Sequence, residues 1–219
     1  MADPASAATT EIPGDIELRR YFPTPVVTMT LPDAIVRNRA LAELILARAR
    51  AEPGTQHSNL GGWQSAWDFT DWCGPVGRHV LDAAIALANR MTVDRRGQPI
   101  RIDWRMNAWA NVNRLGHGNE FHIHPGSFWS GTYYVDDGGI ADDPGLGGEF
   151  EIQDPRGPAP AMYAPMLAFN FPGGHSAGAS ELVRPRAGLM VLFPAWLSHA
   201  VRPYRGTQTR ISIAFNLSL

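Results

Sequence analysis

The second half of the chain consists of short apolar runs that alternate with turn-forming residues. From about residue 100 to the C-terminus, Gly, Pro, Asp and Asn separate these runs. The chain holds 22 Gly and 18 Pro in 219 residues, enough to supply many turns. Such a pattern is typical of a β-sandwich or β-barrel. The expected strands lie at 100–112, 121–124, 130–135, 148–152, 166–171, 189–193 and 210–217.

Helical patterns occur only in the first half. Apolar residues such as Ile35, Val36 and Leu41 recur at helical spacing after Asp33, which is expected to cap a helix that ends near Arg50. A second helix is expected over 74–91, and a proline-containing edge strand within 16–31. Helices followed by many short strands predict an α+β fold.

The length and charge of the chain limit its class. We expect one domain over 16–219, preceded by a disordered leader over 1–15 that lacks the features of a signal peptide. A net charge of −2 favours neither nucleic acid nor an anionic membrane as a partner. The single cysteine, Cys73, excludes an internal disulfide. A free thiol and the absence of a membrane-length apolar run favour a cytoplasmic protein.

A His-x-His pair is the strongest local signal for chemistry. On a strand, residues two apart face the same side, so His122 and His124 present two imidazoles to one point. Neutral imidazole is a common ligand of iron, zinc and copper. The pair alone is also compatible with two histidines that serve only in packing.

A second signal lies near the C-terminus. There Gly188 begins an apolar run that ends at His199, which could complete a three-point metal site with the first two histidines. Arg210 and Ser212 follow and share one face of the last apolar strand. A buried arginine needs an anionic partner, which is either a carboxylate ligand or an acidic side chain of the protein.

These features together resemble the iron(II)/2-oxoglutarate-dependent dioxygenases. The order of a His-x-acid pair, a distal His and an Arg about ten residues later is typical of that superfamily. More narrowly, the chain is similar to a subfamily of 2-oxoglutarate/iron(II) oxygenases with a His-x-His-Pro motif. The resemblance runs from about residue 20 to the C-terminus. The matching segments include SNLGGWQS (58–65), HIHPGSFWSGTYYV (122–135), GGEFEIQDPR (147–156), the run 185–199 and RISIAFN (210–216).

The resemblance implies a double-stranded β-helix, or jelly-roll, core with flanking N-terminal helices. It assigns His122 and His199 to the metal, and Arg210 with Ser212 beside it to the distal carboxylate of 2-oxoglutarate. Tyr134 is the expected counterpart of a tyrosine that contacts the same carboxylate in prolyl hydroxylases. The implied cofactors are iron(II), 2-oxoglutarate and dioxygen.

His124 departs from the superfamily pattern, because most members have Asp or Glu at this position. Three neutral histidines with iron(II) and dianionic 2-oxoglutarate leave no net charge, and a higher iron potential is then expected. The side chain also fills the space that halide-using relatives leave for chloride. A carboxylate from Glu120, Glu149 or Asp154 remains an alternative third ligand.

The resemblance implies oxidation of an unactivated C–H bond of a small organic substrate, such as an amino acid or natural-product intermediate. Hydroxylation and desaturation or cyclisation are both open, and so is a homodimeric assembly. Substrate contacts are expected from the loop around Trp63, from Asn107, Trp109 and Asn111 on one strand, and from Arg156.

Two other functions fit part of the sequence. A three-histidine cupin dioxygenase fits His122 and His124, but Phe128 and Trp129 stand near the place of its usual Glu, and Arg210 has no role there. A non-catalytic jelly-roll protein with structural zinc normally needs a fourth ligand. The remaining histidines that could supply it are His57, His79, His117 and His175.

Overall fold

A computed structural model describes residues 15, 17–19, 21–157, 162, 164–167, 169 and 180–219. Most of the expected leader, residues 1–14, and part of the expected strand over 166–171 lie outside this range. Met166, Leu167 and Phe169 are described and belong to no strand.

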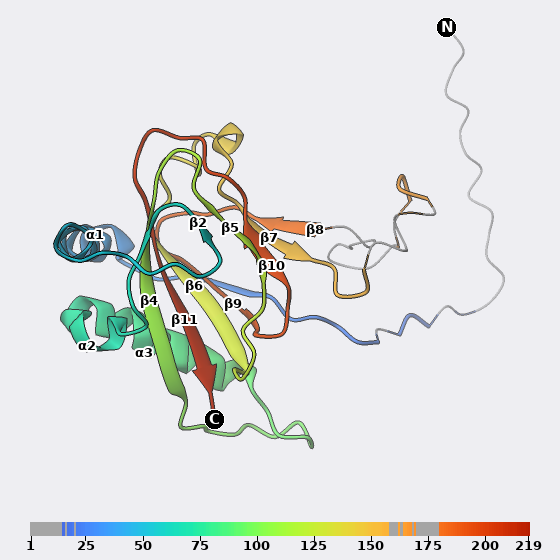
Figure 1. Ribbon diagram of the computed structural model, residues 1–219. Coiled ribbons are helices and arrows are strands. Elements are labelled where there is room, and N and C mark those ends of the chain that lie inside the picture. Colours follow the sequence, from blue (N-terminus) through green and yellow to red (C-terminus); the bar gives the residue numbers. More distant parts are fainter. Residues whose placement is uncertain are drawn as a thin grey trace, which may run out of the picture.

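Two antiparallel sheets form the body of the molecule (Figure 1). The larger sheet has the order β1-β9-β6-β11-β4-β3, and the smaller has the order β2-β5-β10-β7-β8. The strands are β1 Val27–Thr30, β2 Asn59–Leu60, β3 Trp63–Gln64, β4 Arg105–Asn113, β5 Gly118–His122, β6 Trp129–Asp136, β7 Phe150–Gln153, β8 Ser180–Val183, β9 Leu189–Pro194, β10 His199–Val201 and β11 Arg210–Ser218. β1 is an edge strand, as the prolines that flank it predict.

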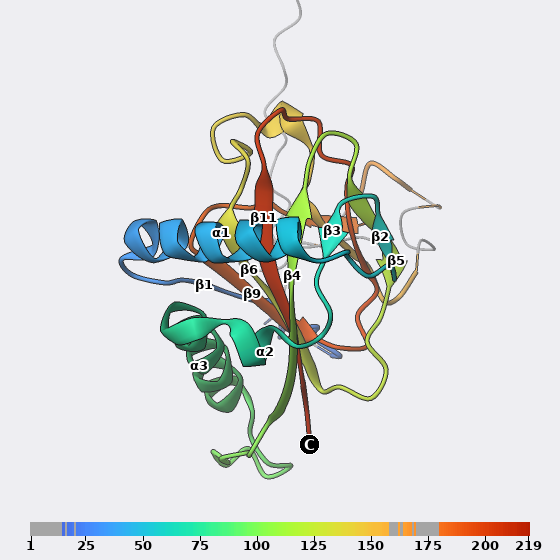
Figure 2. The same ribbon diagram turned by 60° about the vertical axis from the view of Figure 1, so that its left-hand side comes forward.

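The helices lie against one face of the larger sheet (Figure 2). They are α1 Ala34–Ala51, α2 Phe69–Trp72 and α3 Gly74–Met91, and a short 3₁₀ turn, η1, spans Pro144–Leu146. Leu41 and Ile45 of α1 and Val80 and Ala84 of α3 are fully buried in the core between helices and sheet. The α+β architecture predicted from the sequence is confirmed.

Strand alternation divides the larger sheet into two chemically different faces. On β11, Ile211, Ile213 and Phe215 enter the core beneath the helices. The residues that alternate with them, such as Arg210 and Ser212, point to the other face and line the cavity between the sheets. The helix-covered face is therefore apolar, and the inner face carries the polar side chains of a candidate site.

Some local expectations differ from the structure. Asp33 precedes α1, but it has φ 54° and its side chain makes no capping hydrogen bond. Ile35 and Val36 are 82% and 79% exposed, so they do not belong to the buried face of α1, which Asn38, Leu41 and Ile45 form. β2 and β3 lie in the segment around Trp63, which was expected to be a loop.

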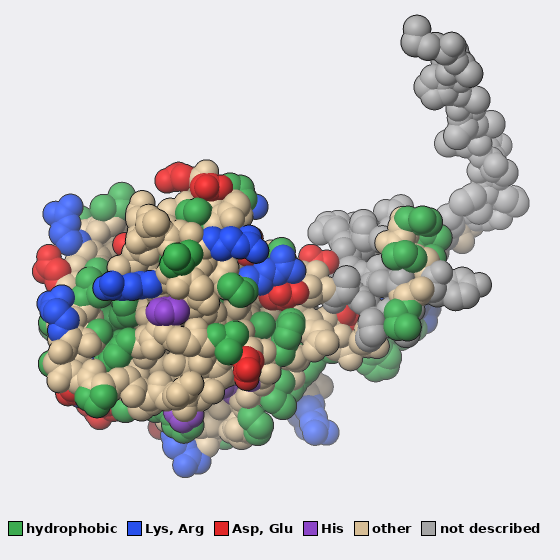
Figure 3. All heavy atoms as spheres, turned by 45° about the horizontal axis from the view of Figure 1, so that its top comes forward, with side chains coloured by type: hydrophobic (Ala, Val, Ile, Leu, Met, Phe, Trp, Pro, Cys, Tyr) green, Lys and Arg blue, Asp and Glu red, His purple; other side chains and the backbone are tan. Residues whose placement is uncertain are grey.

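Neither the surface charge nor the helices have an extreme character. Basic and acidic side chains are interspersed on the face shown in Figure 3. Within the described residues, none of the helices combines the length and apolar character that crossing a bilayer requires.

Candidate active site

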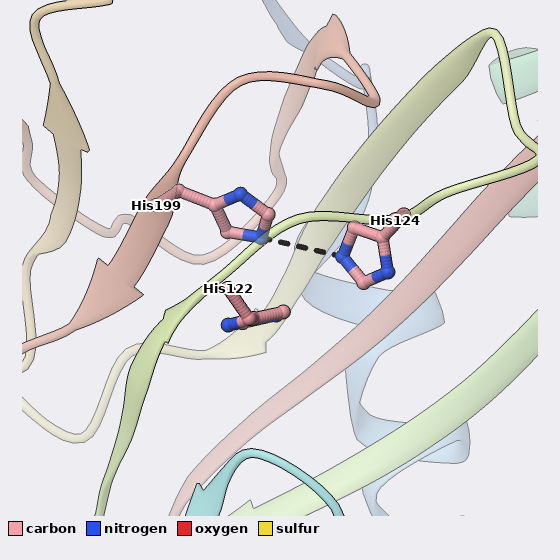
Figure 4. A group of neighbouring side chains, drawn as sticks. All are labelled: His122, His124 and His199. Carbon is pink, nitrogen blue, oxygen red and sulfur yellow. Dashed lines mark hydrogen bonds between the residues drawn. The ribbon is translucent and has the colours of Figure 1, made fainter.

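Three histidines converge between the two sheets. His122 ends β5 and is paired directly with His199, which begins β10. His124 follows two residues after His122 and is held by a backbone hydrogen bond from its N–H to the Ala195 carbonyl, 2.9 Å. One ring nitrogen of each histidine lies within 4.8 Å of the others. The three side chains lie close together in Figure 4.

Backbone carbonyls orient two of these rings. The Nδ1 atom of His122 lies 2.7 Å from the Glu120 carbonyl oxygen, and Nδ1 of His199 lies 2.8 Å from the Leu197 carbonyl oxygen. Nδ1 must carry the proton in both pairs, because a carbonyl oxygen only accepts. Each Nε2 atom therefore keeps its lone pair, which is the state that binds a metal.

The third ring has a different environment. Nε2 of His124 lies 3.3 Å from Nε2 of His199, and Nδ1 lies 3.3 Å from the amide nitrogen of Asn216. The Asn216 amide oxygen accepts a hydrogen bond from the Ser130 hydroxyl, 2.6 Å. In this arrangement His124 Nδ1 accepts, so Nε2 carries the proton. A half-turn of the amide would reverse both pairings and leave Nε2 of His124 free for a metal.

Burial keeps the histidines neutral near pH 7. It lowers the pKa of His124 to about 4 and that of His199 to about 3, and the nearby His122 contributes to both shifts. The pKa of His122 is lowered for the same reason, although its bond to the Glu120 carbonyl opposes the shift. Metal binding requires the deprotonated nitrogen, so these shifts favour ligation.

A buried cation lies on the same inner face. Arg210 is 2% exposed, and its Nη1 donates to the Asn113 side-chain oxygen, 3.3 Å. Its guanidinium carbon lies 5.2 Å from the centre of the Tyr134 ring. The Arg210 Nε and the buried Tyr134 hydroxyl make no hydrogen bond of good geometry with the described residues. A buried cation and hydroxyl in this state suit an anionic ligand.

One cavity of about 390 Å³ connects the two groups. The three histidines, Arg210 and its neighbours Ser212 and Tyr134 all line it. A metal that carries 2-oxoglutarate needs imidazole nitrogens at one end of the cavity and, at the other end, a basic pocket that binds the distal carboxylate. The histidines fit the first requirement, and Arg210 with its neighbours fits the second. Asn107, Trp109 and Asn111 line the same cavity from β4.

Two residues expected to contact substrate lie elsewhere. The Trp63 indole N–H donates to the Glu52 carbonyl oxygen, 3.0 Å, and its ring packs against the core beneath the helices. Arg156 pairs with Asp154 at 2.6 Å and does not line the cavity. Neither residue is retained in the proposed site.

Two aromatic residues at the cavity were not predicted from the sequence. Trp67 is 54% exposed and stacks on His57, with ring centres 5.0 Å apart, and both line the cavity. They flank the Gly-Gly-Trp segment in the loop that was expected to contact substrate. The short pairing of β3 with β4, which turns Trp63 toward the helices, was not evident in the sequence.

No acidic side chain joins the histidines in the described part of the chain. β5 and β10 shift register beside Glu120, which is exposed and whose backbone carbonyl is the hydrogen-bond partner of His122. The Asp154 carboxylate is occupied by Arg156. His57, His79 and His117 also lie outside the group, and His175 is not among the described residues.

Comparisons with known proteins point in one direction. A family model described as "Putative 2OG-Fe(II) oxygenase" matches residues 107–216, which include the three histidines and Arg210. No curated protein matches the sequence.

Several solved structures share the fold. A prolyl-4-hydroxylase from Pseudomonas putida has a TM-score of 0.61 and 16% identity, covering 89% of this chain and 92% of that one. A prolyl hydroxylase from Trichoplax adhaerens was solved with a hypoxia inducible factor peptide fragment. Its TM-score is 0.59 and its sequence identity 11%, and the match covers 88% of this chain and 83% of that one. HygX from Streptomyces hygroscopicus was solved with nickel and 2-oxoglutarate. Its TM-score is 0.55 and its sequence identity 12%, and the match covers 89% of this chain and 83% of that one. The expected double-stranded β-helix core is thereby confirmed.

Proposed function

The chain belongs to the 2OG-Fe(II) oxygenase family, and we propose on that premise that it oxidises an unactivated C–H bond of a small organic substrate. It is an iron(II)- and 2-oxoglutarate-dependent dioxygenase, with dioxygen as the second cosubstrate. An amino acid or a natural-product intermediate is the proposed kind of substrate. Hydroxylation is the simplest outcome, and desaturation or cyclisation would need the same site.

We propose His122, His124 and His199 as the iron ligands. Their ring nitrogens converge, burial keeps them neutral, and they are the one such group among the described residues. Three ligands on one face leave coordination positions open for 2-oxoglutarate and dioxygen. When bound, iron(II), 2-oxoglutarate and dioxygen would supply the chemistry: 2-oxoglutarate would take up one atom of dioxygen to become succinate and carbon dioxide, and the other atom would oxidise the substrate.

Arg210, Ser212 and Tyr134 are the proposed binding group for 2-oxoglutarate. Ser212 pairs across the sheet with Tyr134, and Arg210 lies two residues before it on the same face. The guanidinium and the two hydroxyls can donate to a carboxylate. The protein thus binds and orients the cosubstrate, and the apolar side chains Phe150 and Phe193 beside the histidines exclude water.

One observation carries this proposal. The buried Arg210 Nε and Tyr134 hydroxyl make no hydrogen bond of good geometry with the described residues, and Arg210 and Tyr134 line the same cavity as the three histidines. A cupin dioxygenase would have no use for this cationic pocket.

Anaerobic reconstitution with iron(II) and 2-oxoglutarate tests the proposal. We expect the charge-transfer absorption of the chelate, and succinate formation after dioxygen is admitted. Arg210→Ala should weaken 2-oxoglutarate binding by about 100-fold or more, because a buried charge-assisted pair is lost. Arg90→Ala, near the end of α3 and outside the cavity, is the matched control. If the spectrum does not change and both variants behave alike, the proposal fails.

A further inference from the structure

Aromatic rings line one side of the cavity from its mouth to the histidines. His57 stacks on Trp67, and the Trp67 ring centre lies 6.4 Å from that of Trp109. Trp109 in turn lies 5.8 Å from His124. The half-exposed Trp67 is thus linked by neighbouring rings to the candidate metal site, through Trp109, which is 8% exposed. A flat group that entered here could stack along the path to the iron.

Side-chain amides lie beside these rings. Asn107, Trp109 and Asn111 alternate along the inner face of β4, and Gln64 pairs with Asn111 across the sheet. The amide groups of Gln64, Asn107 and Asn111 hydrogen-bond to no other side chain in the described structure, although all three line the cavity. Each amide offers both donors and an acceptor, so this surface suits an uncharged polar group.

The charge of the cavity disfavours a positively charged substrate. No Asp or Glu lines it among the described residues, and the segment 158–179, largely outside them, contains none in its sequence. With neutral histidines, the charges of iron(II) and 2-oxoglutarate cancel, and Arg210 remains. Among the described side chains that line the cavity, no carboxylate would offset this positive charge for a second cation, which disfavours its binding.

We infer that the substrate presents a flat, uncharged, hydrogen-bonding group to the wall formed by Trp67, Trp109, Asn107, Asn111 and Gln64, and that it bears no ammonium group. This inference rests on the proposed function and narrows its substrate class. A free amino acid does not meet the condition, whereas an N-acylated amino acid or an aromatic amide does. The opposing possibility is that Trp67 and Trp109 bind a cation on their ring faces.

Three probes with the same phenyl ring separate these possibilities: 2-phenylacetamide, phenylacetate and 2-phenylethylammonium. Their binding to the full chain loaded with zinc(II) and 2-oxoglutarate can be followed by ligand-observed NMR, without turnover. We expect 2-phenylacetamide to bind at least about tenfold more tightly than the ammonium probe. Loading is checked first by calorimetric titration of 2-oxoglutarate, so a failure of the proposed function appears in that step.

Variants identify the wall and its charge preference. Trp67→Ala should weaken the amide about tenfold, and Trp67→Phe should restore most of the loss. Trp196→Ala, an exposed tryptophan that does not line the cavity, is the matched control. Asn107→Asp places a carboxylate on the wall, so it should shift the preference toward the ammonium probe by about tenfold.

Any of three results overturns the inference. One is an ammonium probe that binds the unchanged protein as tightly as the amide, which would indicate a cation on the tryptophan faces. Another is that 2-phenylacetamide shows no binding with a dissociation constant of about 10 mM or lower, which is about the weakest affinity expected for such a small probe. The last is equal behaviour of Trp67→Ala and Trp196→Ala.

Discussion

The Asn216 side chain lies 3.3 Å from Nδ1 of His124, one of the proposed metal ligands. Its amide lies between the Ser130 hydroxyl and His124 Nδ1, so its orientation decides whether Nδ1 donates or accepts. We expect Asn216→Asp to keep or raise the affinity for zinc(II), because a carboxylate accepts the Nδ1 proton. Asn216→Leu should lower it by about 10- to 100-fold, the usual effect of losing such an outer partner. Competition with a chelating dye measures both.

The control for this prediction lies on the same strand. Ser218→Ala removes a hydroxyl two residues further along β11, at a half-buried site that does not line the cavity, and should leave zinc affinity unchanged. Weaker binding by Asn216→Asp than by the unchanged protein would contradict the prediction. It would mean that Nδ1 of His124 accepts in the metal-bound state as well.

The buried histidines also make stability depend on pH. Burial holds the pKa of His124 at about 4 and that of His199 at about 3, below the 6.5 of an exposed histidine. The unfolded chain therefore binds more protons between about pH 3 and 6.5, and the metal-free protein should lose stability as the pH falls through that range. Urea midpoints at pH 7 and pH 5 measure the loss.

Removing these histidines should flatten the dependence. The double variant His124→Gln/His199→Gln should lose less stability between pH 7 and pH 5 than the unchanged protein. His79→Gln, an exposed position on α3, serves as the control. An identical pH dependence in all three proteins would show that carboxylates alone account for the effect.

At the scale of elements, β6 must approach its neighbours closely. A Cβ atom at Gly131 would lie 2.6 Å from the Val191 carbonyl oxygen and clash with the Phe215 ring. Gly131 is paired with both β9 and β11, so the backbone has little freedom to move. We expect Gly131→Ala to lower the free energy of unfolding by about 1–3 kcal/mol through overpacking. Gly145→Ala is the control, since its Cβ would meet only the end of the Asp143 side chain.

The sequence predicted elements better than it predicted pairing. The helix over 74–91 and the shared face of Arg210 and Ser212 follow from local periodicity, which a single segment contains. The pairing of His122 with His199 depends on strands 77 residues apart, and the sequence could only suggest it. Local patterns also do not reveal irregularities of register, so the shift beside Glu120 was not foreseen. The same holds for the pairing that turns Trp63 away from the cavity.

At the scale of the whole molecule, the proposed ligands join the two sheets. The histidines come from the smaller sheet and its adjoining turn, whereas Arg210 and Tyr134 belong to the larger sheet. A metal that carried 2-oxoglutarate would therefore be held by both layers at once. Binding of such ligands stabilises the folded state, because the unfolded chain does not assemble the site.

Thermal unfolding measures this link between the sheets. At about 100 times its dissociation constant, each ligand should add roughly 2.7 kcal/mol, or about 5–10 °C in Tm for a chain of this length. We expect zinc(II) to raise Tm, 2-oxoglutarate to raise it further only when zinc(II) is present, and EDTA to reverse both gains. Arg210→Ala should keep the zinc(II) increment and lose that of 2-oxoglutarate, because its guanidinium belongs to the larger sheet alone. If the variant lost both increments, metal and cosubstrate would not occupy separable parts of the cavity, and the assignment of Arg210 to 2-oxoglutarate would be wrong.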